Sequence, residues 1–269
     1  MMSVRLLERS YAALLAGAQA VSRSGGYDCR GYAARWQENL MPGLPLAEIS
    51  DDLGGGAGRE LDGKLCAAHS SAALAVNTFG PWRIGPADLF LAGLTGFQAM
   101  RFEATCPTGL GGTPPHLDLL AQGEVIVAVE SKCTEWMEPR VARFSHSYDR
   151  LRSSHGHSPW FALMQQLRLE PHRYRLVDAA QLVKHALGLL TCYRTREVRL
   201  VYLYWEPSNA TDWPDCHRHR AEADDLANRV ESCSVRLVPI SYRELWEKWT
   251  TLGPPAHLSY LRARYDWPA

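Results

Sequence analysis

Residues 114–132, PPHLDLLAQGEVIVAVESK, have the pattern of two strands joined by a tight turn. The second strand is a short apolar run, rich in valine and isoleucine, that follows the glycine at position 123. Such a run, bounded by a glycine turn, is typical of a buried strand rather than a helix. Glu130 and Lys132 fall at its end. Because side chains alternate along a strand, these two share one face and Ser131 points to the other.

The length of the turn decides whether Asp118, on the first strand, joins this face. A two-residue turn would leave Asp118 on the face opposite Glu130. A three-residue loop at 122–124 pairs Asp118 with Ala128, and Asp118 and Glu130 then lie roughly 7 Å apart along the strand. Gly123 suits the left-handed position of such a loop. The sequence therefore predicts an odd-numbered loop or a bulge here.

A carboxylate and a lysine two residues apart at the end of an apolar strand have two interpretations. In the first, the strand reaches the surface and ends in a solvated ion pair. In the second, two carboxylates hold Mg²⁺ through oxygen and leave water and a substrate phosphate in the other positions. The lysine then stabilises charge on the attacking water or on the transition state.

Asp118, eleven intervening residues and Glu130-Ser131-Lys132 resemble the D…(D/E)xK signature of restriction-endonuclease-like nucleases. ESKCTE at 130–135, HSSAALAVNTFGPW at 69–82 and AAQLVKHALGL at 179–189 resemble a poorly characterised branch of this PD-(D/E)xK superfamily. The resemblance covers roughly residues 60–250. The proline that often directly precedes the aspartate is displaced in this chain to position 115, which changes little because the aspartate carries the chemistry.

The resemblance implies a divalent-metal-dependent nuclease, an endonuclease that hydrolyses phosphodiester bonds of DNA. Asp118 and Glu130 would bind Mg²⁺ or Mn²⁺, with the backbone carbonyl of Ser131 as a further ligand. Lys132 would position or deprotonate the attacking water. In related nucleases a glutamine on the helix after the E-x-K strand often faces the site, and Gln181 has this place in the chain. A solvated helix face is the alternative for Gln181.

Residues 100–105 alternate between apolar and polar side chains, which is typical of a strand. The resemblance implies that this is the first strand of the core, antiparallel to the strand of Asp118. Glu103 would then add an acidic group to the site, and a solvated strand residue is the alternative. Two polar residues of the 69–82 segment, His69 and Asn77, are expected to have capping and packing roles, and a role near DNA is the alternative for both. The helix at 67–78 has Ser70 or Ser71 as its expected cap.

The expected fold class is α/β: a restriction-endonuclease-like core with a central mixed sheet flanked by helices and an N-terminal helical extension. The glycine-rich loop at 54–58 separates this extension, 1–58, from a nuclease-like domain, 59–250, and residues 251–269 form a tail. Strands are expected near 100–105, 115–121, 125–132, 198–205 and, at an edge because it contains proline, 235–240. Helices are expected at 3–23, 28–41, 67–78, 178–190 and 215–231, and from a capping box at 241–244 through Trp249.

A basic stretch stands out from a chain whose formal net charge is zero, with 29 basic and 29 acidic side chains. Residues 140–175 hold seven arginines and no lysine, opposed only by Asp149 and Glu170, and they include several aromatic residues. Arginine suits phosphate oxygens, and aromatic rings stack on bases. The alternative is a surface whose arginines pair within the protein. The residues expected to contact DNA are Arg140, Arg143, Arg150 and Arg152.

The seven cysteines are odd in number and form no C-x-x-C pair, which favours reduced thiols in a cytoplasmic protein. The N-terminus lacks the pattern of a signal peptide, and no apolar run approaches the ~20 residues of a membrane span. The Cys216-His217-Arg218-His219 segment is expected on a helix surface rather than at a metal. Since cutting both DNA strands commonly requires two sites, a homodimer is one expected state.

Two other functions remain open at this point. A nuclease fold can serve as a catalytically silent nucleic-acid-binding or scaffold protein, because fold does not imply function. Such a protein would show no stoichiometric Mg²⁺ or Mn²⁺ site. A hydrolase of small phosphoesters is the third interpretation, which open space around the site and loss of activity on polymers would favour.

Overall fold

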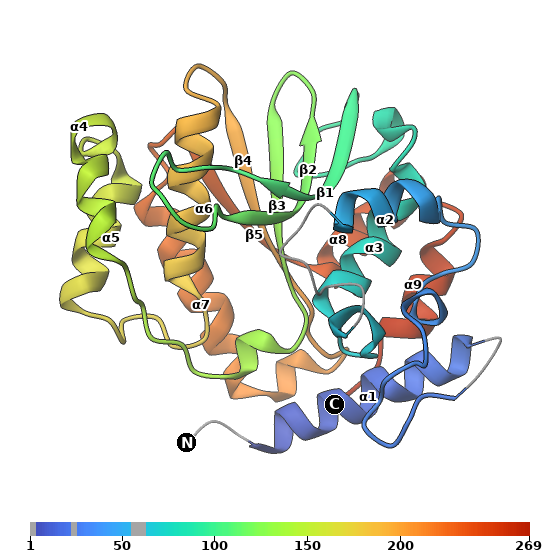
Figure 1. Ribbon diagram of the computed structural model, residues 1–269. Coiled ribbons are helices and arrows are strands. Elements are labelled where there is room, and N and C mark those ends of the chain that lie inside the picture. Colours follow the sequence, from blue (N-terminus) through green and yellow to red (C-terminus); the bar gives the residue numbers. More distant parts are fainter. Residues whose placement is uncertain (1–3, 23–25, 55–62) are drawn as a thin grey trace.

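The computed structural model describes residues 4–22, 26–54 and 63–269, which form one mixed sheet with helices on both of its faces (Figure 1). The expected α/β class is therefore confirmed. The strands lie in the order of the sequence, so every hydrogen-bonded neighbour is also a neighbour along the chain. They are β1 (Ala99–Thr105), β2 (His116–Gln122), β3 (Ile126–Lys132), β4 (Val198–Tyr204) and β5 (Val235–Ser241).

The sheet changes from antiparallel to parallel at β3. The β1–β2 and β2–β3 pairs are antiparallel, whereas the β3–β4 and β4–β5 pairs are parallel. The carboxyl ends of β3, β4 and β5 therefore meet at the same end of the sheet, where β2 begins. β5 is an edge strand, as its proline predicted, and β1 forms the other edge.

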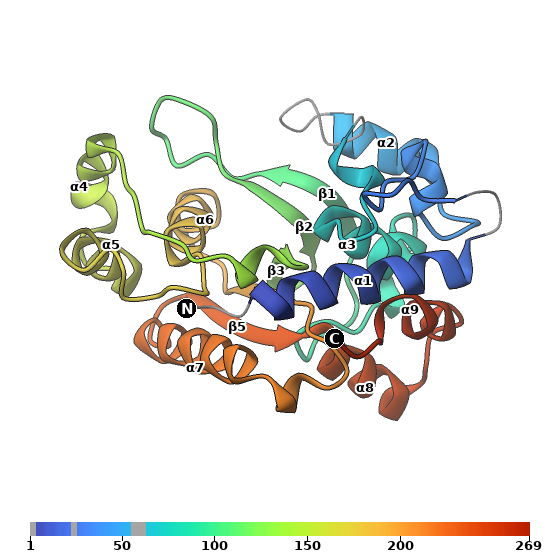
Figure 2. The same cartoon turned by 90° about the horizontal axis from the view of Figure 1, so that it is seen from below.

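Two pairs of helices enclose this sheet. On one face, α6 (Ala179–Cys192) reaches the side chains of β3, and α7 (Pro214–Arg229) reaches those of β4. On the other face, α3 (Ser71–Phe79) and α8 (Tyr242–Leu252) both contact the side chain of Ser131. Figure 2 shows the sheet between these layers. The remaining helices are α1 (Val4–Val21), α2 (Leu46–Gly54), α4 (Arg152–His155), α5 (Pro159–Leu169) and α9 (Leu258–Tyr265).

A glycine fixes the position of α6 over the sheet. A Cβ on Gly188 would lie 2.3 Å from the backbone oxygen of Cys106, which directly follows β1. Any side chain at this position would therefore push the helix away from the strand. The close approach holds the first turns of α6 over the carboxyl end of β3.

The two ends of the described chain pack against each other. α1 lies along α9 (Figure 2), and a Cβ on Gly17 would lie 2.0 Å from the backbone oxygen of Arg264. α2 packs beside β1, where Asp52 accepts a hydrogen bond from the backbone of Phe102. The glycine loop that was expected to divide the chain, at 54–58, lies almost wholly outside the described residues. The boundary at residue 58 stays a prediction.

Two predictions about the helical segments are wrong. Residues 28–41 do not form a helix; they contain only a short 3-10 turn, Trp36–Asn39. The Asp28 carboxylate accepts hydrogen bonds from the backbone of Arg30 and Tyr32, which competes with helix formation. Residues 216–219 were expected on the surface of a helix, but His219, on α7, is fully buried. Its ring stacks on Trp136, and its Nε2 atom shares a hydrogen bond with the Tyr202 hydroxyl.

The predicted helix caps are confirmed. Ser70 caps α3 by accepting the backbone N–H of Ala73, at 3.1 Å. At α8 the Ser241 hydroxyl and the Glu244 carboxylate each accept the other's backbone N–H, which is a complete capping box. All seven cysteines lie in the described residues, and none of them forms a disulfide there. Within the described residues, no helix combines the length and apolar character that crossing a membrane would require.

The packing role expected of Asn77 is also confirmed. Its side chain is fully buried and accepts the backbone N–H of Met41 at 2.6 Å. It donates to the backbone oxygen of Asn39 and to the Tyr265 hydroxyl, at 3.2 and 2.8 Å. One amide thus joins α3, the N-terminal segment and α9, and it leaves no free group for chemistry.

Replacing Asn77 with alanine should destabilise the protein by about 3 kcal/mol, because two buried partners and the half-buried backbone of Met41 lose their hydrogen bonds. Urea unfolding followed by circular dichroism measures this difference. Asn228→Ala, at an exposed position of α7, is the matched control and should change the free energy of unfolding by less than about 0.5 kcal/mol. Equal stability of the two variants would contradict the structural role of Asn77.

Candidate active site

Three carboxylates stand in one row across neighbouring strands at the end of the sheet. The β1–β2 register places Glu103 opposite Asp118, and the β2–β3 register, continued by one residue, places Asp118 opposite Glu130. Directly opposed residues of antiparallel strands have their Cβ atoms about 4.5–5.5 Å apart and face the same side. Lys132 follows two residues after Glu130 on that side.

The hairpin that creates this row has an odd-numbered loop, as predicted, but not at the predicted residues. The last ladder pair joins Gln122 to Ile126, so the loop consists of residues 123–125 instead of 122–124. Asp118 therefore lies opposite Glu130 and not opposite Ala128. The left-handed conformation expected of Gly123 does not occur. The loop starts one residue later because Gln122 still pairs with β3 and its backbone oxygen also accepts the Gln98 N–H.

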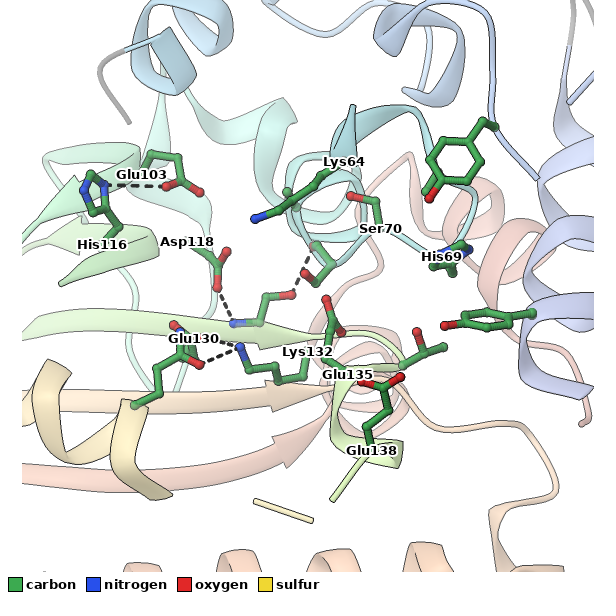
Figure 3. A pocket seen from close by; sticks show the side chains of 18 residues that line it. Lys64, His69, Ser70, Glu103, His116, Asp118, Glu130, Lys132, Glu135 and Glu138 are labelled. Carbon is green, nitrogen blue, oxygen red and sulfur yellow. Dashed lines mark hydrogen bonds and ion pairs between the residues drawn. The ribbon is translucent and has the colours of Figure 1, made fainter. Parts of the chain in front are cut away.

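Asp118 fills a gap where β2 and β3 separate. The ladder between these strands ends at Leu119 and Val129, one residue before Asp118 and Glu130. Beyond this point the Asp118 carboxylate accepts the backbone N–H of Ser131 at 2.7 Å. The end of β3 is thus tied to β2 by a side chain, which fixes one Asp118 oxygen beside the E-x-K segment (Figure 3).

Glu130 is buried and surrounded by donors. Only 2% of the residue is exposed, and one carboxylate oxygen accepts the Lys132 ammonium at 2.5 Å. The other oxygen lies 2.9 Å from Nε2 of His185, on α6. The Lys132 ammonium also donates to the Gln181 side-chain oxygen at 2.9 Å. Gln181 and His185 are four residues apart on one face of α6, so one helix holds both members of the E-x-K pair.

Two carboxylates of the row, Asp118 and Glu130, have pKa values that are shifted in opposite directions. Burial raises the pKa of Glu130, but Lys132 and His185 outweigh burial and lower that pKa to about 2. Burial and the neighbouring Glu130 and Glu103 carboxylates raise the pKa of Asp118 well above its usual value. Burial lowers the pKa of Lys132, but Glu130 and Asp118 more than offset burial, so its pKa is raised and the ammonium stays charged.

Glu103 has an unusual backbone conformation at the site. Its φ is +47°, a left-handed value that is rare for residues other than glycine, and its neighbours Phe102 and Ala104 both pair normally with β2. The carboxylate lies 3.8 Å from Nδ1 of His116 (Figure 3). Strained backbone of this kind is concentrated at functional sites in proteins. The structure therefore brings Glu103 beside Asp118, while its role stays a prediction.

A cavity of about 460 Å³ opens over the row. It runs from the carboxylates to the first turn of α3 and on to α1. Figure 3 shows Glu103 and His116 at one end and His69 at the other, with Lys64 and Ser70 between. The charged or titratable residues in its wall are Lys64, His69, Glu103, His116, Asp118, Glu130, Lys132, Glu135 and Glu138, together with Tyr11 and Tyr32.

The residues around the E-x-K segment hold it in place. The Ser131 side chain points to the opposite face, as expected, where its hydroxyl bonds the Ser71 backbone oxygen and the Tyr242 hydroxyl. The Glu135 carboxylate accepts the backbone N–H of Cys133 at 2.6 Å, so the last residue of ESKCTE caps the turn after β3. Residues 130–135 thus contain both the candidate site residues and the side chains that hold this segment in place.

The four arginines expected to contact DNA are not equivalent. Arg140 donates to the backbone oxygen of Glu135 and shares a second cavity, of about 180 Å³, with Lys132 and Gln181. Arg143 and Arg150 are exposed and have no ion pair within the described part of the chain. Exposed Arg152 lies over the Phe161 ring, at 5.5 Å.

Other arginines of the 140–175 stretch do pair within the protein. Arg168 bonds Asp149, and Arg173 bonds Glu170 at 3.0 Å. For Arg168 and Arg173, the alternative interpretation of a surface whose arginines pair within the protein is therefore correct.

Sequence reasoning missed two features of the site. His185 was not singled out, although its spacing of four from Gln181 predicts the same helix face. Tyr11 of α1 was not placed near the site, because no local pattern reveals that α1 reaches the end of β3. Its neighbour in space, His69, lines the cavity with a ring centroid 4.3 Å from that of Tyr11.

The donors present suit a magnesium ion. Mg²⁺ keeps several waters and binds proteins through one or two carboxylates together with substrate phosphate. Asp118 and Glu130 supply two hard oxygen donors at one cavity. Among residues 4–22, 26–54 and 63–269 no group of three or more His, Cys, Asp and Glu side chains could enclose a metal. Because Mg²⁺ needs only one or two carboxylates from the protein, two carboxylates and a backbone carbonyl are sufficient without such a group.

The mixed sheet and the row of acids beside a lysine define a restriction-endonuclease-like core, as the resemblance implied. Residues 20–266 match the family model described as "Restriction Endonuclease associating with ARP". The chain belongs to this family, and the matched range includes all five strands and every residue in the cavity wall except Tyr11. Comparisons with curated proteins and with solved structures gave no match.

Asp118→Asn should stabilise the metal-free protein at pH 7 by about 1 kcal/mol. The folded state raises the pKa of Asp118, so the native protein loses stability as the pH rises from about 4 through that pKa. Asparagine does not ionise, and its side-chain oxygen can still accept the Ser131 N–H. Urea unfolding in a chelator at pH 7 and pH 4 measures the effect, which should disappear at pH 4. A loss of stability at pH 7 would show that the ionised carboxylate is favoured.

Proposed function

We propose that this protein is a divalent-metal-dependent nuclease that hydrolyses phosphodiester bonds of DNA, an endonuclease. The observation that carries the proposal is the convergence of Asp118, Glu130 and Lys132 from two strands on one cavity, with Gln181 and His185 supporting them from α6. Membership in a family of restriction endonucleases supports the same chemistry.

Asp118, Glu130 and the backbone carbonyl of Ser131 are the residues that would hold Mg²⁺ or Mn²⁺. When bound, the ion supplies positive charge to the phosphate and lowers the pKa of the attacking water. Asp118 is already fixed by the Ser131 N–H, and Glu130 by the donors around it, so both carboxylates are positioned before substrate arrives.

Lys132 acts as a charged donor in this proposal. Its ammonium is held by two acceptors, Glu130 and Gln181, and it borders both the main cavity and the smaller one beside Arg140. From there the ammonium can orient the attacking water and stabilise negative charge on the phosphate oxygens. Gln181 positions the ammonium, and Glu103 adds negative charge next to Asp118.

One observation favours a second function, that of a catalytically silent scaffold with a nuclease fold. Both Glu130 oxygens already have close partners, Lys132 and His185, so an ion must compete with them. Titration with Mn²⁺, followed by calorimetry, separates the two functions. The nuclease binds the ion stoichiometrically and loses it in Asp118→Asn, whereas the scaffold shows no such site.

Lys132→Ala should reduce cleavage of supercoiled and linear DNA at least about a hundredfold in Mg²⁺ or Mn²⁺. Both carboxylates remain to bind the ion. The variant should fold, but with a lower free energy of unfolding, because buried Glu130 loses one of its two close partners. Gel assays measure cleavage, and circular dichroism checks the fold. Lys248→Ala, at an exposed position of α8, is the matched control and should cut like the wild type. Undiminished cleavage by Lys132→Ala would exclude this mechanism.

The exposed arginines Arg143 and Arg150 should contribute to DNA binding through phosphate contacts. Replacing either with alanine should weaken binding and reduce the slope of log K against log salt by about 1, since one phosphate contact is lost. Fluorescence anisotropy with Ca²⁺ between about 50 and 200 mM salt measures the slope. Arg236→Ala, at the start of β5 and thus at the opposite end of the sheet, serves as the control. An unchanged slope in both variants would contradict a DNA-binding role for this surface.

A further inference from the structure

Three aromatic rings from separate segments meet at the far end of the catalytic cavity. Tyr11 comes from α1, Tyr32 from the segment that pairs with Ala67, and His69 from the residue before the cap of α3. The His69 ring lies 4.3 Å from that of Tyr11 and 6.0 Å from that of Tyr32. We call Tyr11, Tyr32 and His69 the aromatic cluster.

The aromatic cluster is open to solvent, unlike a core cluster. Tyr11 is 38% exposed and Tyr32 is 37% exposed, although both are large aromatic residues. Burial lowers the pKa of His69, so its imidazole is neutral at pH 7 and the cluster as a whole carries no charge. An uncharged aromatic surface in a polar cavity offers stacking rather than ion pairing.

The aromatic cluster also separates two hollows. On one side lies the cavity of the carboxylate row, and on the other a hollow of about 480 Å³ that contains Arg30. The Arg30 guanidinium lies 5.7 Å from the centre of the Tyr32 ring. A chain that passed over the cluster would therefore meet Arg30 first, then the rings, and then the wall that carries Lys64, Glu135 and Glu138 before it reached the carboxylate row.

A cation beside exposed aromatic rings is the combination of groups that binds a single nucleic-acid strand. Proteins bind single strands with cations along the phosphates and aromatic side chains on which the bases stack. A base within a duplex is covered on both faces by its neighbours, so only an unstacked base can meet a ring inside a cavity. The aromatic cluster is unsuited to an intact duplex for this reason.

We propose that Tyr11 and Tyr32 form a subsite that stacks an unpaired base of the strand whose backbone reaches the carboxylate row in the same cavity, so that the substrate is single-stranded DNA or an unpaired segment of a duplex. The inference rests on the proposed nuclease function and specifies its substrate class. Arg30, whose exposed guanidinium lies 3.6 Å from the Asp28 carboxylate, exchanges this ion pair for the phosphate beyond the stacked base. The carboxylate row receives a phosphate further along the same strand.

Binding of a fluorescent single-stranded oligonucleotide tests the subsite by anisotropy in Ca²⁺, after gels show that the strand stays intact. Tyr11→Ala and Tyr32→Ala should each weaken binding roughly tenfold, as expected for loss of one stacking ring. Tyr11→Phe keeps the ring and should bind like the wild type. Tyr193→Ala, at the far end of α6, is the matched control. Thermal melting checks that each variant is folded.

Two further substrates make the test specific. The tenfold loss should disappear with a strand of the same length whose sugars lack bases, and a blunt duplex should bind more weakly than the single strand. Folded Tyr11→Ala and Tyr32→Ala proteins that bind the normal strand like the wild type would overturn the subsite. So would a wild type that does not bind single strands.

The outcomes separate the subsite from the nuclease itself. Metal-dependent cleavage of DNA together with indifference to the tyrosines would retain the nuclease and reject the subsite. Ring-dependent binding of single strands without cleavage of any DNA would retain the subsite and reject the nuclease.

Discussion

The buried carboxylate of Glu130 is the constraint on which this site depends. A negative charge that is almost fully removed from water is stable only if donors compensate for the lost hydration. Lys132 and His185 do so, and Gln181 then holds Lys132. Because two of these partners lie on α6, the close approach of that helix to the sheet is a requirement of the site and not only of the core.

Asp118, at the same end of the sheet, makes the folded state less stable at neutral pH. The strands separate at this point, so the backbone N–H of Ser131 has no ladder partner and is taken by the Asp118 carboxylate. Placing three carboxylates in one row raises the pKa of Asp118 and disfavours the folded state at neutral pH. Such a cluster is understandable if a cation or a donor from the substrate compensates for it.

The cavity combines two kinds of surface. Its inner end is charged and rigid, held by α6 and the strands, whereas its outer end is aromatic and is formed by α1 and the segments around Tyr32 and His69. The packing of α1 along α9 therefore affects the site, since it brings Tyr11 to the cavity. Segments that are far apart in the chain, near residues 11, 69, 130 and 181, meet over one row of acids.

The sequence by itself determined the local features of this protein. Apolar runs and turn residues predicted all five strands, the Ser241 capping box predicted the start of α8, and the spacing of Asp118 and the E-x-K segment predicted the acidic site. Periodicity and capping act over a few residues, so they can be read without knowing the fold.

Only the tertiary structure decided the register of the hairpin, the loss of the expected helix at 28–41, the burial of His219, and the places of His185 and Tyr11. These depend on contacts between residues far apart in the chain. One extra ladder pair, Gln122 with Ile126, moves Asp118 directly opposite Glu130, and the helix that covers a strand decides which histidine reaches its carboxylate. Local sequence preferences do not contain that information, because the free energy of such contacts depends on how distant segments of the chain pack together.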